Sequence, residues 1–248
     1  MTPSLPLLGP LADRALEIVD FCFPPLCPLC SEKLAATEQI LCDVCRDGFE
    51  RVERPLCPVC GHGPWTTRET SCSFCLKPPV YFERARSLFH YHPPLSEAII
   101  RLKNSPDRNL ARALARYIFI YMEEDFRTVP IDVIVPVALH PWRERMRGYN
   151  QAELVAVALG RMAGLPVAWE FLRRIRRTAK QNTLPREQRR ANVEGAFVVE
   201  PVGCFKGKKI LLFDDVMTTG ATGNDCARAL KHEGRAEEVS LLTLARAG

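Results

Sequence analysis

The chain has 248 residues, of which 47% are hydrophobic and 25% are charged, a composition that is ordinary for a globular protein. It has no run of about 18 apolar residues and no basic, signal-like start, so we expect a cytoplasmic protein without a transmembrane helix or stable membrane insertion. The net charge is +5, and because residues 139–192 hold twelve Lys and Arg against four Asp and Glu, a local polyanion site is indicated more than a general affinity for nucleic acid.

Residues 1–21 are predicted to form a short amphipathic helix. Leu11, Ala15, Ile18 and Val19 recur at helical spacing and would share one face. We expect this helix to pack on the rest of the protein. Association with a membrane surface is the alternative, which is disfavoured because the stretch is short and carries more acid than base.

Eight of the eleven cysteines form four C-x-x-C pairs, and eleven residues separate each pair from the next. The pairs are Cys27/Cys30, Cys42/Cys45, Cys57/Cys60 and Cys72/Cys75. Two cysteines at this spacing present both sulfurs to one ion, and two such knuckles complete a tetrahedral shell. We therefore predict a double zinc ribbon over residues 22–79, with two closed, structural zinc sites.

The cysteine pattern leaves alternatives open. Consecutive pairs can share an ion, or the pairs can interleave, and rubredoxin-like iron uses the same ligands as zinc. Disulfides are disfavoured in a chain without a secretion signal. The three remaining cysteines, Cys22, Cys204 and Cys226, are expected to be small buried apolar residues.

Beyond the linker Lys77-Pro78-Pro79, residues 80–248 are expected to form one domain. Apolar runs predict strands at residues 85–91, 131–135, 167–172, 195–199, 210–213 and 238–244. Helical periodicity predicts helices at residues 95–103, 109–124, 151–162 and 223–233. The run from Ile210 to Phe213 has the length and composition of a buried parallel strand.

Three arginines follow the strand at residues 131–135. Arg143, Arg145 and Arg147 occupy alternate positions of a predicted loop, just before Gly148-Tyr149-Asn150-Gln151 at a helix start. Guanidinium groups match the geometry of phosphate, and helix N–H groups would lie beside them. A solvated basic loop is the alternative.

Residues 173–190 form a second basic segment, with seven arginines and Lys180 against a single acid. Because like charges repel, this segment is predicted to be mobile without a ligand. A lid over a bound anion is favoured. Binding of single-stranded nucleic acid usually adds aromatic residues, which the segment lacks, and a solvated loop is the remaining alternative.

Residues 208–222 read KKILLFDDVMTTGAT. The apolar strand is predicted to end at Asp214 and Asp215, and the loop from Thr218 to Thr222 leads into the helix at residues 223–233. Loop N–H groups and hydroxyls can cradle a phosphate, and Gly220 permits its close approach. The two carboxylates can accept hydrogen bonds from a vicinal diol or hold hydrated Mg²⁺.

These residues have two other interpretations. An apolar run followed by acids also occurs in P-loop NTPases, but these need a G-x-x-x-x-G-K-[ST] segment, which the sequence lacks. The other alternative is an ordinary buried strand with a turn. The apolar run, the acids and T-T-G-A-T together resemble the phosphoribosyl pyrophosphate (PRPP) signature of type I phosphoribosyltransferases.

Over residues 22 to 245 the chain resembles one family more narrowly, the ComF proteins. The resemblance is carried by the cysteine array, by R-x-R-x-R-G-Y-N-Q-A at residues 143–152, by the PRPP signature and by the residues Gln181, Leu184, Arg189, Asn192 and Gly195-Ala196-Phe197. It implies an α/β fold of the type I phosphoribosyltransferase class, a mostly parallel sheet flanked by helices, behind a small zinc-ribbon domain. It also implies a role in competence, in DNA uptake or in the use of DNA as a nutrient.

The resemblance implies a function for each matching segment. PRPP and Mg²⁺ would be bound by Asp214, Asp215, Val216, Met217, Thr218, Thr219, Gly220, Ala221 and Thr222. Arg143, Arg145 and Arg147 would neutralise pyrophosphate under a lid containing Lys180, Gln181, Arg189 and Asn192. Lys103 would belong to the hood over the acceptor, although the adjacent Asn104-Ser105-Pro106 departs from the family pattern.

The expected reaction is displacement of pyrophosphate from PRPP by an unknown acceptor, with nitrogen as the favoured nucleophile. His90, His92 and His140 are the candidate general bases. The alternative is a non-catalytic PRPP- or nucleotide-binding adaptor, whose ribbons recruit DNA or a protein of the DNA-uptake machinery. Single-stranded DNA is a further candidate partner, although residues 1–80 are acidic overall.

Overall fold

The computed structural model of the chain describes residues 25–35, 40–65, 72–75, 77, 79–126, 128–177 and 188–247, without the side chains of residues 123–126, 189 and 190. The helix predicted for residues 1–21 lies outside these ranges. The chain divides into two compact units, Met1–Asp47 and Gly48–Gly248. The domain boundary predicted between residues 79 and 80 stays a prediction.

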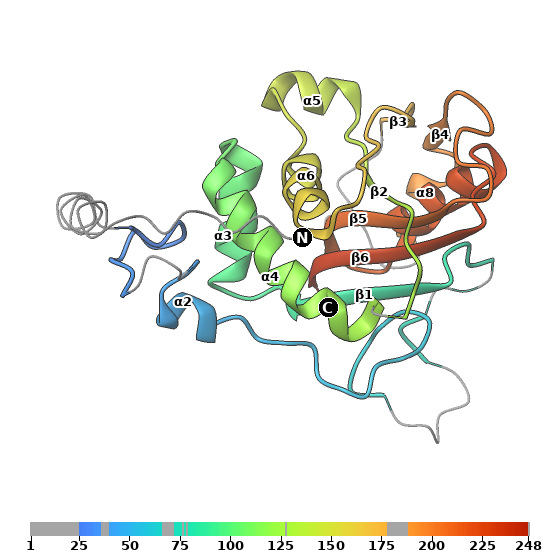
Figure 1. Cartoon of the computed structure of the whole chain (residues 1–248). Coiled ribbons are helices and arrows are strands. Elements are labelled where there is room, and N and C mark those ends of the chain that lie inside the picture. Colours follow the sequence, from blue (N-terminus) through green and yellow to red (C-terminus); the bar gives the residue numbers. More distant parts are fainter. Residues whose placement is uncertain are drawn as a thin grey trace, which may run out of the picture. The chain divides into compact units, whose positions relative to one another are not determined.

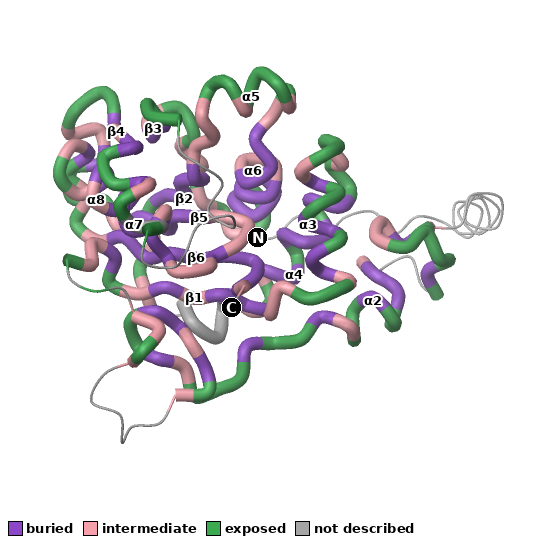
Figure 2. Tube along the Cα trace, turned by 180° about the vertical axis from the view of Figure 1, so that it is seen from behind, coloured by how far each residue is buried: buried purple, intermediate pink, exposed green. Residues whose placement is uncertain are grey.

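A four-stranded sheet forms the centre of the second unit (Figure 1). Its strands are β1 (Arg84–His90), β2 (Val133–Pro136), β5 (Lys209–Met217) and β6 (Glu238–Arg246), in the order β1-β6-β5-β2. All neighbouring strands are parallel. Sheets of this kind are covered on both faces, so their strands are nearly continuous apolar runs, and Figure 2 shows β5 and β6 largely buried.

Helices cover this sheet and account for the α/β class. They are α3 (Leu95–Asn104), α4 (Arg108–Phe126), α6 (Gln151–Ala163) and α8 (Ala221–His232). Helix α8 packs against β5 and β6, α6 packs against β2 and β5, and α4 packs against α6. The predicted fold class, a mostly parallel sheet flanked by helices with a cysteine-rich segment before it, is confirmed.

One predicted strand boundary is wrong, and one predicted strand is absent. Strand β5 does not end at the acids but runs on to Met217, because β6 pairs with it along this whole length, with Asp214 opposite Thr243 and Met217 opposite Arg246. The strand predicted at residues 167–172 does not form, and Val167 makes a single bridge to Ile134. Pairing ends there because the next donor on β2 would be Pro136, which has no N–H.

A short antiparallel pair of strands, a hairpin, forms a separate sheet after the residues where a strand was predicted. It pairs β3 (Leu172–Arg174) with β4 (Phe197–Val199), and α7 (Gln188–Val193) lies within the connection. The strand predicted at residues 195–199 is therefore confirmed in its second half. Strand β3 is at the start of the segment predicted to be a lid, of which residues 178–187 are outside the described ranges.

The predicted arginine loop is helical instead. Helix α5 (Pro141–Arg147) begins at His140, whose ring accepts a hydrogen bond from the N–H of Trp142 at 3.2 Å, and Pro141 occupies its first turn. It ends at Gly148, whose φ of 81° is left-handed. These start and stop residues explain why a basic stretch of only seven residues folds as a helix.

One buried carboxylate joins the hairpin to α8. Asp225 is 5% exposed and accepts hydrogen bonds from the N–H groups of Gly195, Ala196 and Phe197 at 2.9 to 3.1 Å. Arg228 completes the cluster by donating to Asp225 at 2.9 Å and to the Phe197 carbonyl at 2.9 Å. The base of the hairpin is thereby held on the helix that follows the T-T-G-A-T loop.

The leftover cysteines differ in burial. Cys226 is fully buried in α8, as predicted. Cys204 is only partly buried, although it packs against the core. Cys22 lies outside the described residues.

We predict that Asp225→Ala destabilises the protein by about 3–5 kcal/mol, because the change leaves Arg228 and three backbone donors without their buried acceptor. The matched control is Asp132→Ala, which removes an exposed carboxylate that accepts from the N–H of Lys209 at 2.7 Å. Chemical denaturation should show a large loss only for the first variant. Equal losses would contradict the assigned role of Asp225.

Candidate functional site

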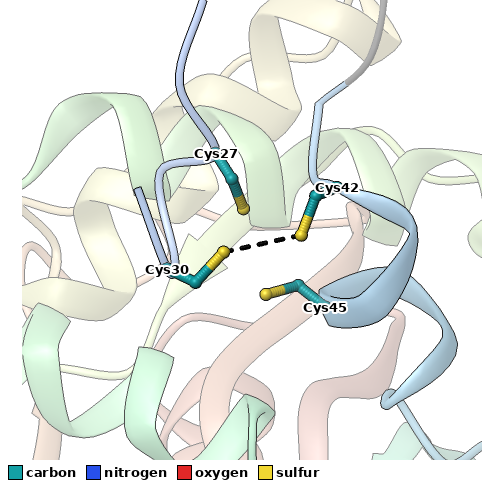
Figure 3. A group of neighbouring side chains, drawn as sticks. All are labelled: Cys27, Cys30, Cys42 and Cys45. Atoms are coloured by element: carbon teal, nitrogen blue, oxygen red, sulfur yellow. Dashed lines mark hydrogen bonds between the residues drawn. The ribbon is translucent and has the colours of Figure 1, made fainter. Parts of the chain in front are cut away.

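The eight paired cysteines form two clusters. Cys27, Cys30, Cys42 and Cys45 make the first, and Cys57, Cys60, Cys72 and Cys75 make the second, with the ligand atoms of each cluster within 4.8 Å of one another. Figure 3 shows the four sulfurs of the first cluster pointing toward a common centre. Consecutive pairs therefore share a site, and interleaved pairing is excluded.

The sulfur positions fit a tetrahedral metal ion. Sulfur–sulfur distances of 3.5 to 3.6 Å join the pairs Cys30/Cys42, Cys57/Cys75 and Cys60/Cys72. A tetrahedron with Zn–S bonds of about 2.3 Å has edges of about 3.8 Å. Four sulfurs fill the shell, so both clusters are suited to structural zinc rather than to catalysis.

Burial also acts on the thiols of both clusters. Burial, followed by the neighbouring thiols, raises the pKa of Cys45 and that of Cys75 well above the ordinary value for a thiol. Burial also raises the pKa of Cys60 to about 11. A divalent ion offsets this unfavourable crowding of sulfurs, because it stabilises the thiolate form of each ligand.

A cavity of about 870 Å³ opens at the carboxyl ends of β2, β5 and β6. In parallel α/β sheets this edge is where ligands bind. The whole stretch from Asp214 to Gly223 lines the cavity, together with Lys103 and Asn104 of α3. Arg143, Arg147 and Arg174 add further positive charge to the lining. We refer to this cavity as the cleft.

The Asp215 carboxylate is held from two sides of the cleft. It accepts from Lys103 Nζ at 2.9 Å and from Gln151 Nε2 at 3.0 Å. Arg147 in turn donates to the Gln151 amide oxygen. Residues from α3, α5, α6 and β5 thus form one polar chain across the cleft floor, and Lys103 lies within reach of the acids.

Asp214 has an unusual electrostatic environment. Its carboxyl is partly buried at the wall of the cleft and accepts a hydrogen bond from the N–H of Asp215 at 2.9 Å. Burial, and then the negative charge of Asp215, raise the pKa of Asp214 to about 8, against a smaller opposing effect of Lys103. Two adjacent carboxyls that resist double ionisation suit a site that receives a cation or diol hydroxyls.

The T-T-G-A-T loop leads directly into α8. The helix begins at Ala221, two residues before the predicted start, because Gly220 takes a left-handed φ of 81° and acts as the N-cap. The first helical bond runs from the N–H of Asn224 to the Gly220 carbonyl at 2.8 Å. N–H groups of the first turn and the positive end of the helix dipole therefore face the cleft, as an anion requires.

Helix α5 separates the three predicted arginines. Successive residues of a helix turn by about 100°, so Arg143 and Arg147 share one side and Arg145 points away from it. The first two line the cleft, whereas Arg145 is exposed and is absent from its described lining. Alternation along a loop is therefore the wrong description, and only two of these arginines reach the cleft.

The other predicted residues fall into two groups. Lys180 and Gln181 lie outside the described residues, and the side chain of Arg189 is not described, whereas Asn192 is half-buried in α7. The three histidines are not among the described residues that line the cleft. His140 caps α5, and the ring of His92 contacts Glu50 at 2.8 Å.

Arg174 lines the cleft but was not singled out from the sequence. It is 8% exposed, and its guanidinium lies over the Phe197 ring at 5.2 Å from the centroid. Burial lowers the pKa of Arg174 from its ordinary value, and Asp214 is one of the charges that oppose this effect. The alternation of side chains along a strand could have identified Arg174 in the sequence. Leu172 and Arg174 are buried on one face of β3, while Arg173 is exposed on the other.

The fold also supplies the aromatic residue that the basic segment lacks. The guanidinium of Arg177 lies over the Trp142 ring, 4.3 Å from its centroid. Trp142 itself remains 48% exposed on α5. Tertiary structure thus places a tryptophan beside Arg177, in the basic segment that follows β3.

Among the residues that the structure describes, none of the helices is long and apolar enough to cross a membrane. This finding agrees with the sequence expectation for the described part of the chain.

Comparison with known proteins gives consistent relatives. A family model described as a double zinc ribbon domain matches residues 18–76. Competence protein F of Haemophilus influenzae is 33% identical over 177 residues, which cover 70% of this chain and 77% of the relative. DNA utilization protein YhgH of Escherichia coli (strain K12) is 36% identical over 166 residues, 65% of this chain and 72% of the relative.

Two further similarities are weaker or cover less of the partner. Competence protein ComFC of Bacillus subtilis (strain 168) is 31% identical over 166 residues, which cover 65% of this chain and 63% of the relative. A crystal structure of adenine phosphoribosyltransferase has a TM-score of 0.35 at 14% identity, over 60% of this chain and 75% of that one.

We predict that Asp214→Asn stabilises the ligand-free protein more at pH 9 than at pH 5.5. Because the folded pKa of about 8 lies above the ordinary value of 3.8, the folded state retains a proton and loses stability as pH rises between these values. Asparagine does not ionise and so escapes this loss. Thermal melts of both proteins at the two pH values test this, and an equal difference at both would contradict it.

Proposed function

This chain belongs to the ComF family, and from that premise we propose that it binds PRPP with Mg²⁺ in the cleft and transfers the phosphoribosyl group to a nitrogen acceptor. The names of its relatives support a place for this activity in competence and DNA utilization. The single observation that carries the proposal is the meeting of the two acids, the T-T-G-A-T loop and three arginines in one cavity.

The acidic wall and the loop would hold the ribose phosphate half of PRPP. Residues Thr218 to Thr222 and the first turn of α8 would hold the 5′-phosphate. Asp214 and Asp215 would accept hydrogen bonds from the ribose hydroxyls. Hydrated Mg²⁺ would be held beside these carboxylates, where it would supply positive charge to the pyrophosphate oxygens.

The basic wall would hold the leaving group. In the proposed step the bond between the anomeric carbon and pyrophosphate breaks, the electron pair leaves with pyrophosphate, and the acceptor nitrogen bonds to that carbon. Negative charge develops on the leaving oxygens, so fixed guanidinium donors lower the barrier. Arg143, Arg147 and Arg174 line the cleft and would supply these donors, whereas Arg145 is not among the described residues that line it.

The acceptor would enter from the side of α3. Tyr91, Ile100 and Asn104 line the cleft there, and Ile100 is 49% exposed although it is apolar. Lys103 of the same helix turn holds Asp215 in the ligand-free protein. We therefore propose that the end of α3 provides the hood, in keeping with the prediction made for Lys103.

Calorimetric titration with PRPP and Mg²⁺ tests the binding half of the proposal. Relative to wild type, the double variant Asp214→Asn, Asp215→Asn is expected to lose at least about a hundredfold in affinity, since it removes both carboxyl groups that would hold the ribose hydroxyls and hydrated Mg²⁺. Asp132→Asn, an exposed change away from the cleft, is the control. Unchanged affinity in a folded double variant would contradict the proposal.

A second candidate function is a non-catalytic adaptor that binds PRPP or a nucleotide and recruits DNA. The Arg177–Trp142 pair favours it, because arginine and exposed aromatic rings together bind single strands by charge and stacking. Release of pyrophosphate from PRPP, followed by ³¹P NMR with a panel of nitrogen acceptors, separates the two functions. Tight PRPP binding without release across the panel would support the adaptor.

The role of Arg174 can be tested against a matched control, because the adjacent Arg173 lies on the same strand but is exposed. Arg174→Met is expected to weaken binding of PRPP and of inorganic pyrophosphate by about tenfold or more while leaving ribose 5-phosphate unaffected. Arg173→Met removes an exposed arginine of the same strand, which pairs with Glu200 at 3.3 Å, and is expected to change neither. An equal loss for all three ligands would indicate a purely structural role for Arg174.

A further inference from the structure

The second cysteine cluster is built into the edge of the main sheet within the Gly48–Gly248 unit. Residues 50–52 run antiparallel to β1, with the N–H of Val52 donating to Leu88 at 3.1 Å and the N–H of His90 donating to Glu50 at 2.8 Å. The knuckle itself continues along β1, since the N–H of Ala85 donates to the Val59 carbonyl at 2.6 Å. The cluster therefore covers what would be a free strand edge.

Gly61 shows how closely the knuckle approaches the sheet. Its φ is a left-handed 66°, and a Cβ atom at this position would lie 2.3 Å from the Ala85 carbonyl oxygen. No L side chain fits at that distance without moving the backbone. The contact between knuckle and β1 is thus a fixed packing feature rather than a loose surface contact.

Two arginines of the sheet reach the knuckle. Arg86 of β1 donates to the carbonyls of Cys57 and Pro58 at 3.3 and 3.2 Å. Arg246, the last residue of β6, is 3% exposed and donates to the Cys60 carbonyl at 2.8 Å. Both cations thus contact residues of the knuckle that supplies two ligands.

The positive charges of Arg86 and Arg246 can offset the negative charge of the second zinc centre. A zinc ion with four thiolates carries a net charge of −2, and a buried charge of that size is costly unless opposite charges lie near it. Arg86 and Arg246 supply +2. In the first cluster the nearby Arg46 instead contacts Asp43 at 2.8 Å and Asp47 at 2.9 Å, so its charge is already compensated.

Arg246 also stands next to the cleft. Its carbonyl accepts from the N–H of Tyr91 at 2.8 Å, and the N–H of the following Ala247 donates to Met217 at 2.9 Å. Tyr91, Met217 and Ala247 all line the cleft. A single buried side chain therefore connects the second cluster with the strand end that forms part of the cleft wall.

We propose that Arg86 and Arg246 are the counter-charges of the second zinc centre, and that Arg246 lets zinc loading at this centre position the cleft wall. The first half stands on the cysteine and arginine geometry alone. The second half rests on the proposed PRPP function. The two zinc centres accordingly differ in role, because only the second is a structural part of the cleft-bearing unit.

Zinc release tests the first half in the full-length chain. In a Cys42→Ser background only the second centre keeps four ligands, so zinc transferred to a chromophoric chelator reports that centre. Arg246→Met is expected to lower the zinc affinity of the second centre by about tenfold or more, because removing a side chain that contacts a metal ligand typically has an effect of this size. Arg246→Lys should recover much of the loss, and Arg86→Met should lose less because its side chain is partly exposed.

Arg84→Met is the matched control, since Arg84 lies two residues earlier on β1 and makes none of these bonds among the described contacts. Zinc retention equal to this control in both Arg86→Met and Arg246→Met would overturn the first half. If Arg246→Met does not fold in excess zinc, as judged by circular dichroism, Arg86→Met and Arg246→Lys decide the question.

PRPP titration of the same proteins tests the second half. Arg246→Met should bind PRPP more weakly than Arg84→Met at limiting zinc, and excess zinc should restore its affinity. An affinity that does not respond to zinc would overturn this half. A wild-type chain that does not bind PRPP would overturn it together with the proposed function, whereas the chelator titration would still decide the first half.

Discussion

The pairing of β5 with β6 is the constraint on which the rest of this structure depends. Strand β6 is buried along almost its whole length and β5 is buried from Ile210 to Phe213, so a buried and mostly apolar part of the ladder holds the two strands in one register. A slip by one residue would exchange the faces of every side chain and bury the acids in the core. With the register fixed, Asp214 lies opposite Thr243, and Thr243 in turn meets Ser87 of β1 through a buried contact of 2.7 Å.

Electrostatic balance decides how the remaining elements meet that sheet edge. Asp215 is neutralised by Lys103, which comes from α3, and is hydrogen-bonded by Gln151, which comes from α6. Asp225 collects the donors of the hairpin, so that buried Arg174 is held near Asp214. Asp215, Asp225 and Arg174 thus each interact with another segment of the chain, which is the condition under which buried charges are tolerated.

Local sequence was a good guide wherever the determining interaction lies within a few residues. The C-x-x-C spacing, the apolar run before Asp214 and the helix stop at Gly164 are all of this kind, and most predicted helices and strands have the observed type and nearly the observed bounds. The missing strand at residues 167–172 shows the limit. Whether Val167 extends a ladder depends on where β2 ends, and β2 ends at Pro136.

The sequence by itself determined the two metal clusters, the α/β class and the acid and T-T-G-A-T segment, because in each case residues close in the chain carry the chemistry. Only the tertiary structure decided which cysteine pairs share an ion, which arginines face the cleft and that Arg174 and Arg246 serve buried sites. The physical reason is the same throughout. Pairing, facing and charge compensation depend on distances between segments far apart in sequence, and these distances exist only once the strands have taken their register and the helices have packed on them.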